Sequence, residues 1–204
     1  MKNIRCFLGV IAAMLSFGLA VQSKAAESAD VSREIADLFS AFCLEKFPDN
    51  AALDALAKSD LSTPMSSDEV KRYLHNDPGR GWYLRTKLGL YAITIEAPPY
   101  VTCAVRRMTP SGLATAKPYI DAVGAYAQKH NGKLSNAPPQ KAKSPDGADI
   151  SAYPYVMQDS NGKSSDMFIL FLTNYHDQVS GEWRADSEGG VGVEVRLVHQ
   201  LVPK

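Results

Sequence analysis

The sequence predicts an α+β fold in which helices pack on one face of an antiparallel sheet of about five to six strands. Between residues 31 and 75 apolar side chains recur every three to four residues, which is typical of amphipathic helices. From Gly81 to Met108 the period changes to two, which indicates strands. Residues 191–201 alternate between apolar and polar side chains, as expected for an antiparallel strand with one face in water. The expected order is ααα-βββ-α-βββ.

Three helices are expected before residue 81. The expected ranges are 31–47, 50–58 and 66–75. Pro48 ends the first range and suits the first turn of the second. Ser66 or Ser67, followed by Glu69, resembles the capped start of a helix. The run Asp77-Pro78-Gly79 then predicts a turn.

One further helix and six strands should follow. The strands are expected at 82–87, 90–96, 100–108, 152–158, 167–175 and 191–201, and the helix at 111–130. Pro118 places the regular part of that helix from about Lys117 onward. Asn161-Gly162 between two β-rich segments predicts a hairpin. Residues 133–149, rich in proline and lysine, are expected to form a loop, with an extended piece at most at its start.

Two cysteines, Cys43 and Cys103, are predicted to form a disulfide. Cys43 lies on the apolar face of the first expected helix, and Cys103 shares a strand face with Val101 and Val105. Both thiols point inward if this helix lies on the sheet. Two free thiols or a metal site are the alternatives, but no neighbouring cysteine or histidine pair completes a tetrahedral zinc spacing. A bond that closes a loop of about 60 residues would stabilise the fold by roughly 4 kcal/mol.

Residues 1–25 have the layout of a cleavable secretory signal peptide. Lys2 and Arg5 precede an apolar run from residue 6 to residue 20, and Ser23-Lys24-Ala25 offers small residues to a signal peptidase. A retained N-terminal anchor is the alternative, although the run is short for a membrane span. Residues 26–204 would then be a single α+β domain, periplasmic or secreted, where disulfides persist.

The charge balance argues against polyanionic partners. Removal of residues 1–25 takes away three basic residues and no acidic one, which leaves 19 basic and 22 acidic residues. Such a balance provides no general attraction to nucleic acid or to anionic lipid. We therefore expect no nucleic-acid partner and no membrane association after cleavage. No motif predicts a cofactor or a metal.

The sequence contains no complete catalytic set. His176 and Asp177 lie in a polar loop, where the imidazole could serve as a general base. Adjacent residues seldom face each other, however, and no Gly-x-Ser-x-Gly supplies a nucleophile. A solvated loop histidine is the plainer interpretation. We expect a non-enzymatic protein and keep a small periplasmic hydrolase, with His176 as general base, as the alternative.

Four residues are candidates for binding. Trp183 lies in the same polar loop and either tucks onto the core or offers a flat contact, and Tyr100 follows a stiff two-proline turn. Arg85 and Arg106 lie on neighbouring expected strands. If the register places them on one face, they could bind a carboxylate or phosphate bidentately. The alternative is a solvated face that is salt-bridged to Glu96 and other acids.

Residues 82–107 carry a resemblance to known sequences. They include a glycine-led strand with Tyr91 and the run Pro99-Tyr100-Val101-Thr102-Cys103-Ala104-Val105. This stretch resembles small exported proteins of Gram-negative bacteria that carry a helix cysteine and a later strand cysteine and have no assigned activity. The resemblance covers residues 35–130 and implies an envelope location. We therefore expect an exported binding or interaction module, such as an inhibitor or immunity-type partner of another exported or envelope protein.

Overall fold

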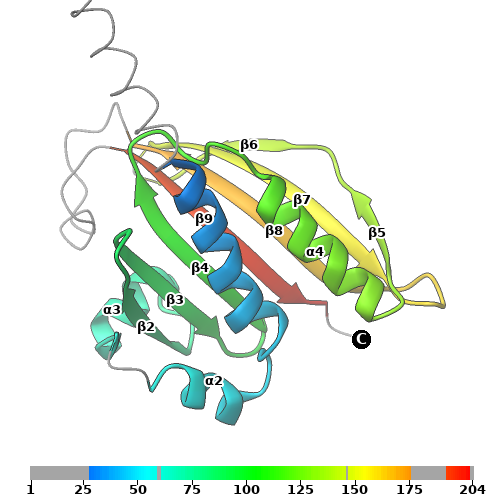
Figure 1. Ribbon diagram of the computed structural model, residues 1–204, viewed down its shortest axis with the longest axis horizontal. Coiled ribbons are helices and arrows are strands. Elements are labelled where there is room, and N and C mark those ends of the chain that lie inside the picture. The colour runs from blue at the N-terminus through cyan, green and yellow to red at the C-terminus, as the bar shows by residue number, and fades with distance from the viewer. Residues whose placement is uncertain (1–27, 59–60, 146, 176–191, 203–204) are drawn as a thin grey trace, which may run out of the picture.

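A computed structural model describes residues 28–58, 61–145, 147–175 and 192–202. Within these ranges the chain forms one nine-stranded antiparallel sheet in the order β1-β2-β3-β4-β9-β8-β7-β5, and β6 also pairs with β7 (Figure 1). The α+β class and the antiparallel sheet are confirmed. The number and order of the strands differ from the expectation, because β1 lies between two helices and β5 and β6 follow the last helix.

The described elements are bounded as follows. The strands are β1 (Ser62–Pro64), β2 (Gly79–Arg85), β3 (Leu90–Glu96), β4 (Thr102–Thr109), β5 (Lys133–Asn136), β6 (Gln140–Lys143), β7 (Asp149–Gln158), β8 (Ser164–Asn174) and β9 (Val193–Leu201). The helices are α2 (Asn50–Leu56), α3 (Ser67–Tyr73) and α4 (Lys117–Lys129). Residues 28–39 are also α-helical and continue into the π-helical turn η1 (Ser40–Leu44). No helix among the described residues has the length and apolar character that a membrane crossing requires.

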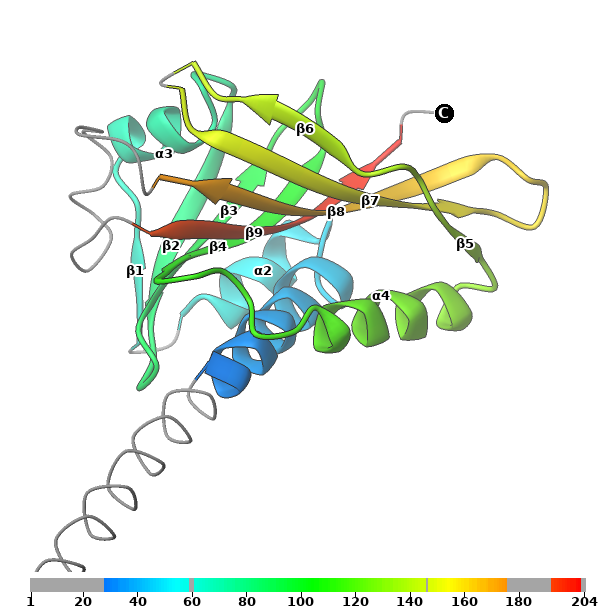
Figure 2. The same ribbon diagram turned by 90° about the horizontal axis from the view of Figure 1, so that it is seen from above.

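The main hydrophobic core lies between one face of the sheet and the helix of residues 28–39, η1, α2 and α4 (Figures 1 and 2). Ile35 and Phe39 on the first helix and Tyr119 on α4 are fully buried there. The Phe39 and Tyr119 rings pack 5.5 Å apart, so the two long helices contact each other as well as the sheet. We call this side of the sheet the helix-covered face.

The predicted disulfide between Cys43 and Cys103 is present. It joins η1 to β4, with the two Cα atoms 5.4 Å apart and both residues fully buried. Val105, two residues after Cys103, faces the same core. The packing of the first helix on the sheet is therefore fixed by a covalent bond as well as by apolar contacts.

Helix α3 lies on the opposite face of the sheet, so the expectation that all helices cover one face is wrong (Figure 2). Val70 and Leu74 pack with Met65 and Ala92 in a second, smaller apolar cluster. Ala92 on β3 belongs to this cluster and Tyr83 on β2 packs against it, so this part of the second face offers α3 an apolar surface. We also expected the second face of the sheet to be exposed to water. At the centre of the sheet this expectation is wrong, because Val198 on β9 is buried.

The expected loop at residues 133–149 contains two strands, of which β5 matches the extended piece expected at its start and β6 was not expected. β5 pairs with the C-terminal half of β7, and β6 pairs with its N-terminal half. All four residues of β6 are exposed, and its lysines occupy the outer edge of the sheet. Edge strands are commonly polar and lysine-rich, which protects them from pairing with other chains. The same composition removes the apolar alternation by which a strand is predicted.

Candidate functional site

The sheet register places two arginines directly opposite each other. Arg106 on β4 is the cross-strand partner of Arg196 on β9. Their chain neighbours Val105 and Leu197 belong to the main core. Since successive side chains of a strand point to opposite faces, both arginines project from the face that the long helices leave uncovered. We call this side the open face.

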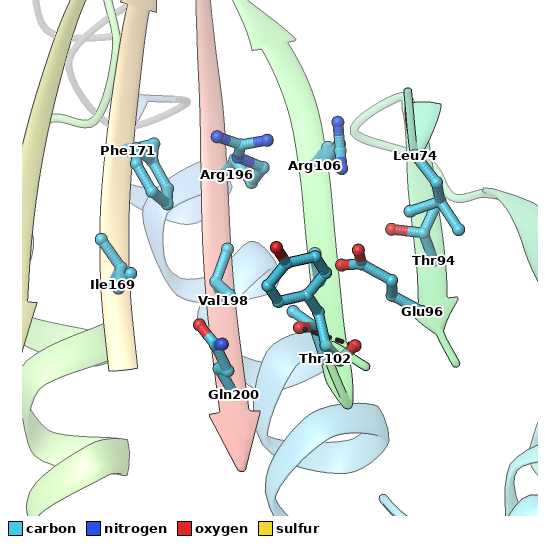
Figure 3. Close-up of a pocket in the computed structure, with 12 residues that line it drawn as sticks. Leu74, Thr94, Glu96, Thr102, Arg106, Ile169, Phe171, Arg196, Val198 and Gln200 are labelled. Carbon is cyan, nitrogen blue, oxygen red and sulfur yellow. Dashed lines mark hydrogen bonds between the residues drawn. The ribbon is translucent and has the colours of Figure 1, made fainter. Parts of the chain in front are cut away.

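The open face contains a hollow with a volume of about 230 Å³, which we call the open-face pocket. Strands β3, β4, β8 and β9 form its base (Figure 3). Leu74, directly after α3, and Tyr100, just before β4, also line it. Its lining residues are Leu74, Thr94, Glu96, Tyr100, Thr102, Ala104, Arg106, Ile169, Phe171, Arg196, Val198 and Gln200. The pocket is therefore apolar at its base and charged at one end.

An aromatic ring supports each guanidinium group. The Arg106 guanidinium carbon lies 5.2 Å from the Tyr73 ring centroid, and that of Arg196 lies 4.2 Å from the Phe171 ring centroid. An Nη of Arg106 also donates a hydrogen bond of 3.2 Å to the Tyr73 carbonyl. Stacking on an aromatic face holds the planar guanidinium in a fixed orientation. Figure 3 shows the two groups next to each other on neighbouring strands.

The hydrogen bonding of the two arginines is incomplete. Arg106 is only 8% exposed, and the buried Nε atoms of both arginines have no hydrogen-bond partner among the described residues. Burial, together with the charge of Arg106, lowers the pKa of Arg196 to about 10. Glu194, which is buried two positions along β9, acts in the opposite direction on this pKa. A buried donor without an acceptor costs about 1–3 kcal/mol, so folding alone does not favour this arrangement.

Glu96 supplies the acidic group of the pocket. Burial and a hydrogen bond with Asp77 raise its pKa, while Thr102 and the charge of Arg106 act to lower it. Together with the two arginines, Glu96 gives the lining a net formal charge of +1. The two cations and the carboxylate lie on different strands of the same hollow (Figure 3). The pocket therefore has the charge to accept a single negative charge.

The sequence-based candidates fall into two groups among the described residues. Arg106 and Tyr100 line the open-face pocket, and Tyr100 is 52% exposed at its edge. Arg85 shares the open face but is exposed, pairs in register with Leu90 and does not line the pocket. The cross-strand partner of Arg106 is instead Arg196, one of the polar residues in the alternating segment 191–201, which was not among the sequence-based candidates. Only the β4–β9 register reveals that connection.

Three further candidates, His176, Asp177 and Trp183, lie outside the described residues. The general-base role of His176 and the contact role of Trp183 remain predictions. Within the described ranges, no group of three or more His, Cys, Asp or Glu side chains is arranged to hold a metal ion.

A second polar group, His199 with Asp166, lies in the main core. The His199 Nδ1 donates to the Cys43 carbonyl at 2.7 Å, and Nε2 lies 2.7 Å from the Asp166 Oδ1. Burial alone would raise the pKa of the Asp166 carboxyl, but hydrogen bonds, above all from His199, lower it. Burial and Asp166 raise the pKa of the Tyr126 hydroxyl to about 12. His199 is fully buried, as expected for a hydrogen-bonded core histidine, and this group has a structural role.

Comparison with known proteins assigns no family. No protein-family model matches the sequence, no curated protein is detectably similar to it, and no solved structure matches it. Function is therefore inferred from the geometry of the open-face pocket.

Proposed function

We propose that the protein is an exported, non-enzymatic binding module whose ligand site is the open-face pocket. The observation that carries this proposal is the Arg106–Arg196 pair, in which a buried and a partly buried cation face each other and the buried Nε atom of each lacks a hydrogen-bond partner among the described residues. Like charges directly opposite in a sheet are destabilising. Groups that a fold holds against their own preference are concentrated at functional sites.

Two observations support an exported protein. Residues 1–25 have the charge and hydropathy pattern of a secretory signal. The Cys43–Cys103 bond needs an oxidising compartment to persist. A periplasmic or secreted location meets both requirements.

The dimensions of the site favour binding of a small group. A volume of about 230 Å³ is below the roughly 300–1,000 Å³ of drug-sized ligand sites. A large protein interface would need a broad surface instead. If the ligand belongs to another exported or envelope protein, as the sequence suggested, that partner would have to insert a single side chain or a chain end.

A hydrolase is not the function that we propose. The described residues hold a histidine–carboxylate pair, His199 and Asp166, but it is buried in the core and does not line the open-face pocket. Catalysis by such a pair needs substrate within hydrogen-bond reach. The alternative with His176 as general base draws no support from the described geometry.

The proposal is tested by locating ligands on the purified chain. Methyl NMR signals of Ile169 and Val198 report on the pocket, and those of Val123 in the main core serve as the control. We expect members of a chemically diverse fragment set to shift the Ile169 and Val198 signals and to leave the Val123 signals in place. A set in which no fragment shifts the pocket signals at millimolar concentration would contradict the proposal.

A further inference from the structure

We infer that the open-face pocket binds a small monocarboxylate with a flat apolar body, whose carboxylate lies between the guanidinium groups of Arg106 and Arg196. This inference rests on the proposed function and names its ligand class. It is argued from the charge, the orientation of the two cations and the apolar base of the pocket.

The charge of the pocket favours a ligand that carries a single negative charge. Arg106 and Arg196 against Glu96 leave a net formal charge of +1 in the lining. Glu194 is only 6% exposed beside Arg196 and adds a further negative charge nearby. A dianion such as hydrogen phosphate would exceed the available positive charge and would be repelled by both acids. A monocarboxylate balances the charge of the lining residues themselves and meets less repulsion from Glu96 and Glu194 than a dianion does.

The orientation of the arginines suits a carboxylate. The two guanidinium groups are on adjacent strands in direct register and are each held by an aromatic ring. Planar guanidinium groups bind carboxylate oxygens through paired N–H donors. One carboxylate between the two groups would give both an acceptor and would remove their mutual repulsion. The bound state thus relieves the unfavourable contact that the free protein contains.

The apolar base of the pocket indicates what is attached to the carboxylate of the ligand. Ala104 and Val198 lie on the row of the sheet next to the arginine pair, and Ile169 continues that row on β8. Tyr100, which is 52% exposed, adds an aromatic ring to the lining of the same pocket. A flat ring or short apolar chain attached to the carboxylate would lie on these side chains and could contact Tyr100. The small volume excludes a long or bulky acid.

Calorimetric titration with benzoate, benzamide and inorganic phosphate separates the contribution of the ligand's charge to the affinity from that of its apolar body. Benzamide has the shape of benzoate without its charge, and phosphate has charge without the apolar body. We expect benzoate to bind about tenfold or more tightly than either of the others, as expected for a charge-assisted bond of about 1.5–3 kcal/mol. Tighter binding of phosphate would overturn the inference. Equal binding of benzamide would also overturn it.

Four variants test the residues. Arg106→Met and Arg196→Met should each weaken benzoate binding by about tenfold or more, because each removes one charged donor. Glu96→Gln should strengthen it, because it removes a negative charge from the lining. A gain of affinity cannot result from misfolding, so this variant keeps the test valid if an arginine variant is unstable. Arg85→Met, on the same face but outside the pocket, should bind as the wild type does.

The outcomes distinguish this inference from the proposed function. If fragments shift the pocket signals but the arginine and Glu96 variants leave benzoate affinity unchanged, the pocket is a binding site and the carboxylate inference is wrong. If no fragment shifts those signals, the proposed function itself fails. A short peptide with a free C-terminus is titrated in parallel. If the peptide binds more tightly than benzoate, the carboxylate that the pocket recognises would be the C-terminus of a protein partner. That result would overturn the inference of a small-molecule ligand.

Discussion

At the scale of single residues, Arg106 and Arg196 are held in an arrangement that electrostatics opposes. They are cross-strand partners, both stack on aromatic rings and both have Nε atoms without acceptors among the described residues. The stacking contacts favour each guanidinium separately, whereas the facing charges disfavour the pair. The coupling between the two side chains should therefore be repulsive in the free protein.

A double-mutant cycle measures that coupling. Arg106→Met alone removes the repulsion between the two charges, and so does Arg196→Met alone. In the double variant this gain in stability is obtained only once, although both stacking contacts are lost. The double variant should thus lose more stability than the sum of the single variants, by roughly 0.2–1 kcal/mol. Urea unfolding of the four proteins gives the value. A double variant that loses less than the sum would indicate an attractive pair and contradict this account.

The Asp166–His199 pair should make the free energy of unfolding depend on pH in the acidic range. Hydrogen bonds lower the pKa of Asp166 in the folded protein below its unfolded value of about 3.9. Its contribution is therefore present above about pH 4 and is lost as the pH falls through the folded pKa. Asp166→Asn should cost about 1–3 kcal/mol at pH 7, and the difference from wild type should shrink below about pH 4.

Urea unfolding at pH 7, 5 and 3 checks this expectation. Asp149→Asn is the matched control, because Asp149 pairs with Lys143 on the surface at 2.8 Å with both side chains largely exposed. That change should cost only about 0–1 kcal/mol. A wild-type advantage over Asp166→Asn that persists unchanged at pH 3 would be inconsistent with a lowered pKa.

At the scale of elements, α3 positions side chains that border the open-face pocket. Ser66 and Glu69 form a capping box, in which the Ser66 amide donates to the Glu69 carboxylate at 2.7 Å and the Glu69 amide donates to the Ser66 hydroxyl at 3.3 Å. The helix ends at Tyr73, which stacks with Arg106, and Leu74 lines the pocket. Local capping is thus linked to the geometry of the site.

Ser66→Ala should destabilise the protein by about 1 kcal/mol, because it removes the side-chain acceptor at the N-cap. Ser67→Ala, one residue later inside the helix, should change the stability little. Denaturant unfolding of the two variants gives the comparison. Equal effects of the two substitutions would show that the capping box does not stabilise α3.

Elements with local signals could be predicted from the sequence. The serine–glutamate cap marked α3, Pro118 marked the start of α4, and the Asn161-Gly162 turn marked the β7–β8 hairpin. The short and polar edge strands could not be predicted, because their hydrogen bonds to a neighbour, and not their side chains, make them strands.

The candidate site could be predicted only in part for a related reason. Arg106 and Tyr100 were identified from their residue types, but Arg196 is 90 residues away from Arg106 in the sequence. Which residues face each other across β4 and β9 is fixed by the register of the sheet. An amphipathic pattern also does not say which face of the sheet a helix covers, and α3 covers the second one.

At the scale of the whole molecule, the disulfide links the helix layer to the middle of the sheet. Cys43 and Cys103 are 60 residues apart in sequence, and the bond joins η1 to β4, the strand that also carries Arg106. Replacing both cysteines by alanine should cost roughly 4 kcal/mol in the chain-entropy description.

Denaturant unfolding measures this loss, and thiol labelling checks the bond itself. In a chain with Cys6 replaced by serine, denatured but unreduced protein should show no reactive thiol, and reduction should release two. Two labelled thiols before reduction would contradict the disulfide.

The two faces of the sheet carry different groups, and our proposal assigns binding to the open face. The helix-covered face holds the main core, the disulfide and the Asp166–His199 pair, and the open face holds the arginine pair. Substitutions in the pocket should therefore alter binding while the core remains folded.

A crystal structure of the chain grown with saturating benzoate tests this division most directly. We expect the carboxylate oxygens within hydrogen-bond distance of both Arg106 and Arg196, with the ring over Ala104 and Val198. An empty pocket, or benzoate bound only at another surface, would contradict the account.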